Sequence, residues 1–251
     1  MHDGAVRLLL TMLLIAAPLR AGVVYDFVTT IETPRFSSRQ TGRVAVEGQS
    51  YRADFNGRGS RDIDVVISRD GDQTAVYVDL TRCRWSYRNR IGPIRSSGFF
   101  HLPSDEGDAV IGEPVVEHRL EGVETIAGFA ATKHVIDIRY RLVGVLADTA
   151  VRGSVVARAT IWTVDTLPPL PMRRDLRTGH PTIDEQLAGV SGSLRGMIVR
   201  HELEVTRTFD EGVPQTERTI TTVSNLRVAA LPDSLFAVPE DAAYVQRAAG
   251  S

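Results

Sequence analysis

The chain has 251 residues, with 29 basic and 31 acidic side chains and a formal net charge of −2. Such a balance provides no electrostatic attraction for nucleic acid or for an anionic membrane surface, so neither is expected as a partner. The single cysteine, Cys83, also excludes an internal disulfide.

The first 21 residues have the order of a secretory signal peptide. Arg7 gives a positive start, residues 8–17 form an apolar run, and Ala21 ends the segment with a small side chain. The apolar run is much shorter than the ~20 residues that cross a hydrocarbon core, so an uncleaved anchor is the weaker alternative. We therefore expect cleavage near Ala21 and a soluble periplasmic chain without a transmembrane anchor.

The mature part of the chain alternates apolar and polar residues, which predicts amphipathic strands. In residues 133–142 the even positions, from His134 to Leu142, form an apolar face, and the odd positions carry most of the charges. Such strands are typical of antiparallel sheets, since the strands of parallel sheets are apolar throughout. The pattern recurs in residues 23–31, 151–163 and 199–209.

Glycines with polar neighbours separate these segments. Gly48, Gly71 and Gly212 each stand in a short turn-forming stretch between two apolar runs. The runs between such turns predict about five strands in residues 22–87 and about four longer ones in residues 115–228. We expect a single mainly β domain over residues 22–240.

Three stretches do not fit the strand pattern. The prolines of residues 166–171 cannot supply the N–H groups of a strand ladder, which predicts a connector. Residues 91–112 contain scattered glycine, proline, serine and aspartate, which predicts a second irregular crossing. Residues 241–251 are expected to be a frayed C-terminal tail.

A short helix is predicted after the connector. Thr182 and Glu185 match a capping box, in which each side chain satisfies an N–H group of the helix start. Gly189 and Gly192 are expected to end the helix. Its apolar stripe consists of Ile183, Leu187 and Val190.

Residue types that carry enzyme chemistry are present, but not in catalytic arrangements. No two of the six histidines are spaced as a metal site, and His134 and His201 stand among apolar strand residues, which favours core histidines. Cys83 would be reactive if it were exposed between Arg82 and Arg84, but a lone cysteine on a strand is more often buried and inert. We therefore expect no metal, no cofactor and no catalysis.

Three phrases of the chain are distinctive. They are residues 64–71 (DVVISRDG) leading into residues 76–79 (VYVD), residues 124–129 (ETIAGF) and residues 235–239 (LFAVP). With nearly the whole mature chain around them, they resemble the periplasmic proteins grouped as domain of unknown function 4412 and, more distantly, the LolA-like fold of the lipoprotein carriers. The resemblance implies a strongly curved antiparallel sheet, a half-barrel, with one or two short helices crossing its concave face. It also implies that the concave face can hold acyl chains.

Two functions from different classes fit these observations, and a hydrolase built from scattered residues ranks third. The first is a binding or carrier module whose concave apolar face receives a lipid, a lipoprotein acyl chain or another hydrophobic ligand. The second is a structural or interaction protein of the cell envelope, whose sheet is plugged by its own helix and loops and meets a protein partner. In the first, the helix lies at the mouth of the concave face and contacts the ligand through Ile183, Leu187 and Val190.

Overall fold

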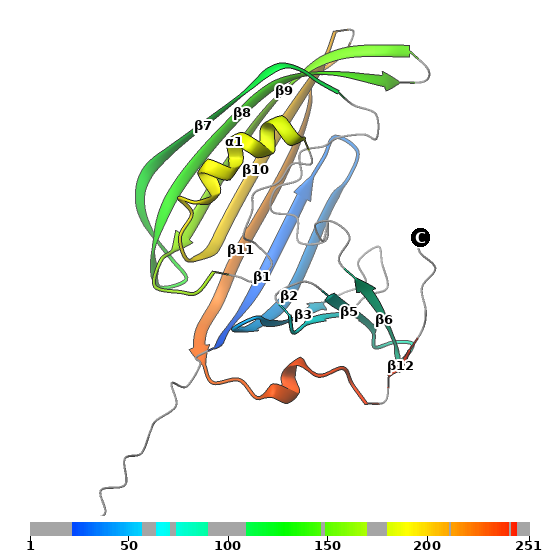
Figure 1. Cartoon of the computed structure of the whole chain (residues 1–251), viewed down its shortest axis with the longest axis vertical. Helices are drawn as coiled ribbons and strands as arrows, with labels where there is room; N and C mark the ends of the chain where they lie inside the picture. The colour runs from blue at the N-terminus through cyan, green and yellow to red at the C-terminus, as the bar shows by residue number, and fades with distance from the viewer. Residues whose placement is uncertain are drawn as a thin grey trace, which may run out of the picture.

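In the computed structural model, strands account for most of the described chain, and one α-helix lies against them (Figure 1). The predicted signal peptide lies outside the described residues, as do most of the predicted irregular crossing and most of the predicted tail. The structure describes residues 22–56, 64–70, 74–89, 109–146, 149–169, 180–210, 212–240 and 242–244.

The described secondary structure divides into two halves along the chain. The first half contains β1 (Gly22–Glu32), β2 (Ser37–Glu47), β3 (Ser50–Asn56), β4 (Val65–Ser68), β5 (Thr74–Asp79) and β6 (Arg84–Asn89). The second half contains β7 (Ala109–Ile126), β8 (Phe129–Leu146), β9 (Thr149–Val164), α1 (Pro181–Ser191), β10 (Met197–Phe209), β11 (Gln215–Ala229), the 3-10 helix η2 (Asp233–Phe236) and β12 (Ala243–Tyr244).

All twelve strands belong to one sheet, in the order β12-β6-β5-β4-β3-β2-β1-β11-β10-β9-β8-β7. Neighbours along the chain pair antiparallel within each half, and the antiparallel pairing of β1 with β11 joins the halves. The two-residue strand β12 pairs parallel with β6. The sheet curves without closing, since β7 and β12 lie at opposite ends of the order (Figure 1). The predicted mainly β fold with a curved antiparallel sheet is confirmed.

Irregular pairing accompanies this curvature. The register shifts between Val24 and Asp26 of β1, between Ile198 and Arg200 of β10, and twice along β7. An extra residue in one strand of a pair bends that strand and increases its twist. The shifts in β10 and β7 therefore help the long strands of the second half to curve around α1.

The apolar residues form three clusters, two of which lie on opposite faces of the first half of the sheet. Val23 and Tyr25 of β1 belong to one cluster, and Val24 between them belongs to another that includes Phe236 of η2. The third cluster, here called the helix cluster, packs α1 against β8, β9 and β10. Its members are Ile136, Ile138, Tyr140, Leu142, Val155, Ala157, Ala159, Ile161, Ile183, Leu187, Val190, Ile198, Leu203 and Val205.

The structure differs from the predicted strands in number and at the C-terminus. The first half contains six strands and the second half five before η2, one more in each than predicted. The first four residues of the strand β7 were expected to belong to the irregular crossing. Ala243 and Tyr244, expected in the frayed tail, instead pair with Arg84 and Trp85 of β6.

The start of α1 also differs from the prediction. The N-cap is His180, no side chain caps the helix, and Thr182 and Glu185 are exposed, so the predicted capping box is wrong. Pro181 occupies the first helical turn, where its missing N–H is not needed and its fixed φ suits a helix. At the other end, Gly192 is the C-cap as predicted, whereas Gly189 lies inside the helix.

Candidate functional site

The predicted ligand residues lie on one face of α1 and point into the helix cluster. Ile183 and Leu187 are 0% exposed, and Val190 is 8% exposed. All three pack against residues of the sheet. The structure therefore brings the three predicted residues together, on the side of the helix that covers the strands.

The sheet surface beneath α1 is apolar over three strands. β8 contributes Ile136 and Ile138, whose paired neighbours on β9 are Ala159 and Ala157. Small side chains in the middle strand let a helix approach the sheet closely. The contact between α1 and the sheet also includes a hydrogen bond from Gln186 Nε2 of α1 to the carbonyl oxygen of Pro114 of β7 (2.9 Å).

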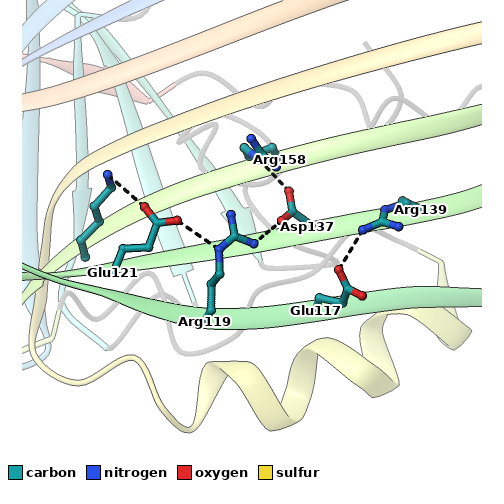
Figure 2. A network of polar contacts seen from close by, with 7 residues as sticks. Glu117, Arg119, Glu121, Asp137, Arg139 and Arg158 are labelled. Carbon is teal, nitrogen blue, oxygen red and sulfur yellow. Dashed lines mark hydrogen bonds and ion pairs between the residues drawn. The ribbon is translucent and has the colours of Figure 1, made fainter.

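The opposite face of β7, β8 and β9 carries a network of charged side chains (Figure 2). Arg119 of β7 donates to Asp137 of β8 and to Glu121. Asp137 also accepts a hydrogen bond from Arg158 Nε of β9 (2.7 Å). Beside them, Arg139 Nη2 donates to Glu117 Oε2 at 2.8 Å. Opposite charges thus tie three neighbouring strands together on this outer face.

Asp137 is the most buried member of the charged network. It was expected on a solvent-exposed face, but it is only 6% exposed. Burial opposes ionisation of the carboxyl, yet the hydrogen bonds and charges of Arg158 and Arg119 outweigh burial and lower the pKa of Asp137. The carboxylate is therefore held charged between two strands, which is a structural role. A general acid would need a raised pKa, whereas the pKa of Asp137 is lowered.

Trp162 of β9 lies on the same outer face and is only 4% exposed. Lys133 Nζ lies 5.7 Å and Arg200 Cζ 4.8 Å from the centre of its ring. Cations at these distances from an indole ring are attracted to its electron-rich face. The aliphatic parts of both side chains can also shield the ring from water.

Two histidines that sequence reasoning did not connect meet on the helix side of the sheet. His118 Nε2 and His134 Nδ1 lie 3.2 Å apart, and the rings stack with their centres 5.4 Å apart. His134 Nε2 also lies 3.1 Å from the hydroxyl oxygen of Thr163. His134 is thus a buried histidine with partners on both nitrogens, which confirms its prediction as a core histidine. Sequence alternation alone could not suggest this pair, because His118 reaches the face of His134 only through the register shift between Leu120 and Gly122.

The histidine pair should make stability depend on pH. Burial lowers the pKa of His118, and burial followed by repulsion from His118 lowers the pKa of His134, both from 6.5. The unfolded chain therefore binds more protons below about pH 6.5, so the free energy of unfolding should fall as the pH drops from about 7.5 to 5. His118→Gln should make this fall shallower, because it removes one titrating ring and its repulsion of His134. Urea denaturation across this pH range measures both slopes, and equal slopes would contradict the role of the pair.

The remaining candidates from the sequence stand apart from one another. His201 is fully buried, as predicted for a core histidine, and His180 packs near Tyr140. Cys83 is exposed in the turn before β6, so the prediction that it is buried is wrong. Within the described ranges, no three histidine, cysteine or acidic side chains come together as a metal site. None of the helices in those ranges is long and apolar enough to cross a membrane.

No protein-family model and no curated protein matches this chain. Membership of domain of unknown function 4412 therefore stays a prediction. Among solved structures, the chain is similar to an uncharacterized conserved protein from Thermus thermophilus, with 11% identity, a TM-score of 0.39, and coverage of 91% of this chain and 92% of that one.

Two other similar structures have family descriptions. A LolA superfamily protein from Nitrosomonas europaea is 8% identical with a TM-score of 0.33, over 88% of this chain and 91% of that one. A protein of domain of unknown function 1329 from Desulfovibrio piger is 14% identical with a TM-score of 0.30, over 86% of this chain and 89% of that one. TM-scores this low carry no conclusion about the function or ligand of this chain.

Proposed function

We propose that this protein is an exported periplasmic binding or carrier module that holds a hydrophobic ligand, a lipid or a lipoprotein acyl chain, between α1 and the sheet. The observation that carries the proposal is the apolar surface of β8, β9 and β10, which the 11-residue helix α1 covers through three side chains. No catalytic step and no cofactor is part of the proposed function.

The helix is a suitable cover for a site that opens. Isolated helices shorter than about 12 residues are marginal in water, so α1 depends on its contacts with the sheet. It also lacks a side-chain cap at its N-terminus. An element held mainly by apolar contacts can move away when another apolar surface takes its place.

The energies of the helix contacts and of a bound acyl chain are similar. Burying Ile183, Leu187 and Val190 contributes about 1.5–3 kcal/mol each. An acyl chain contributes about 0.8 kcal/mol for each buried methylene, so about eight methylenes match the three side chains. In the proposed complex the ligand lies on the strands, and the three side chains contact the ligand instead of the sheet.

The second candidate function is a structural or interaction protein of the envelope. The observation that favours it is the complete burial of Ile183 and Leu187 within the helix cluster. If α1 stays in this position, it covers the apolar surface of β8, β9 and β10 and leaves no room for a ligand there. Ligand binding is therefore the property that distinguishes the two functions.

Replacing Leu187 by Trp is expected to weaken binding of a fluorescent fatty acid by about tenfold or more, or 1.4 kcal/mol. The larger side chain occupies the space beneath α1 that the ligand has to share. In the unliganded protein it should also overpack the helix cluster, which lowers stability by about 1–3 kcal/mol. Fluorescence titration measures the affinity, and circular dichroism checks that the sheet is intact.

Ala188→Trp is the matched control, because Ala188 is the next residue of α1 and is exposed. This change should leave both fatty-acid affinity and stability nearly unchanged. Native mass spectrometry of the protein purified from periplasm should also detect bound lipid. Absence of any fatty-acid or lipid binding by the unmodified protein would refute the carrier function and leave the interaction protein.

A further inference from the structure

The strand β7 forms one edge of the sheet. It has 18 residues, and β8 is its strand partner among the described residues. In an antiparallel pair, alternate residues turn their N–H and C=O groups away from the partner, so an edge strand offers a row of main-chain groups to another strand. The pairing of β7 with β8 is regular over residues 115–120, between two register shifts.

The charged side chains of this regular segment are already paired within the molecule. Charges on an edge strand normally discourage a second strand from pairing there. Here Arg139 donates to Glu117, and Arg119 donates to Asp137 and Glu121. An incoming strand therefore meets balanced charges. It also meets Leu120, a large apolar side chain that is 65% exposed.

The sequence around His118 is complementary to itself in the antiparallel direction. With His118 opposite the same residue of a second copy, Glu117 of each copy lies opposite Arg119 of the other. Val116 of each copy then lies opposite Leu120 of the other. Opposite charges and apolar pairs directly across two strands are the combinations that stabilise a sheet.

The two neighbouring centres of symmetry lose this complementarity. A centre at Glu117 sets two glutamates opposite each other, and a centre at Arg119 sets two arginines opposite each other. Like charges directly opposite destabilise a strand pair. Within the regular segment, the charge pattern thus favours the register centred on His118, with a second copy of this chain as the partner.

We propose that the protein forms a two-fold dimer in which β7 pairs antiparallel with β7 of a second copy, centred on His118. The pairing continues the sheet across the dimer axis and covers the edge of each copy. It also buries the exposed Leu120 against Val116 of the other copy. The dimer does not depend on the proposed ligand, so the two proposals can fail separately.

Charge exchange at the two complementary positions tests the dimer. Analytical ultracentrifugation of the purified protein at micromolar concentrations should find a dimer. In the Glu117→Arg dimer, an arginine faces an arginine at both positions where residue 117 of one copy lies opposite residue 119 of the other. In the Arg119→Glu dimer, a glutamate faces a glutamate at the same two positions. Each variant alone should raise the dissociation constant by about tenfold or more. An equal mixture of the two variants should restore a dimer, because every arginine again faces a glutamate.

The matched control is Glu204→Arg, the same charge change at an exposed position of the central strand β10. It should leave the dimer unchanged, and circular dichroism of all variants should match that of the unmodified protein. The proposal is overturned if the unmodified protein is a monomer, or if it is a dimer that Glu117→Arg and Arg119→Glu leave intact. It is also overturned if the mixed variants stay monomeric.

Discussion

Replacing Ile138 by Asp is expected to lower the free energy of unfolding by about 4 kcal/mol or more. Ile138 is 0% exposed, and its neighbours across the adjacent strands are Val116 of β7 and Ala157 of β9. The substitution removes apolar contacts of the helix cluster. It also places a carboxyl group among apolar side chains, where it must either lose its hydration or take up a proton. Urea denaturation of the variant and of the unmodified protein measures the difference.

Arg141→Asp is the control for this change. Arg141 is exposed on the opposite face of the same strand, so introducing an aspartate there should change the free energy of unfolding by less than about 0.5 kcal/mol. The pair of variants separates the effect of the buried face from the effect of an aspartate in a strand. Equal losses for Ile138→Asp and Arg141→Asp would contradict the assignment of the two faces of β8.

The two faces of β8 could be predicted from the sequence because the alternation of apolar and polar residues lies within this one strand. The even positions from His134 to Leu142 are all buried, as the alternation indicates. The other face was predicted less well, since Val135 and Asp137 are also buried there. Asp137 is paired there with arginine side chains from β7 and β9, and alternation within one strand contains no information about these neighbours.

The first half of the sheet shows a second limit of alternation. All four residues of β4 are buried, so this strand has no solvent-exposed face. One reason is the segment around η2, which is distant in the sequence, and whose Phe236 belongs to the same cluster as Val65 and Ile67. Because the covering segment is distant in the sequence, the pattern of residues within β4 does not indicate that both of its faces are buried.

The charged network could not be predicted because it depends on a bulge. β7 and β8 meet at Ile126 and Phe129, and counting back regularly from this pair sets Arg119 opposite Ile136, on the apolar face. The register shift near Gly122 adds one residue, so Arg119 lies opposite Val135 instead. Gly122 has φ of 111°, a conformation that glycine adopts easily. The bulge thus carries Arg119 to the outer face, where it reaches Asp137.

Replacing Gly42 by Ala is expected to destabilise the protein by about 3 kcal/mol or more, although it adds only one methyl group. Gly42 of β2 lies opposite Phe27 of β1 and Phe55 of β3. The two rings meet edge to face, with their centres 5.9 Å apart. A Cβ atom on Gly42 would lie 2.3 Å from the carbonyl oxygen of Asp54 and 2.6 Å from the ring of Phe27. Because one of these atoms belongs to the backbone, the strand itself would have to move.

Gly189→Ala makes the same chemical change where the structure leaves room for it. Gly189 lies inside α1, and a Cβ atom there would have no atom within 4 Å apart from its chain neighbours and the helix's own backbone. Alanine is the better helix former, so this variant should be more stable than the unmodified protein by about 0.5–1 kcal/mol. Thermal unfolding should therefore shift downward for Gly42→Ala and upward for Gly189→Ala. An upward shift for both would mean that Phe27 and the Asp54 carbonyl do not close over Gly42.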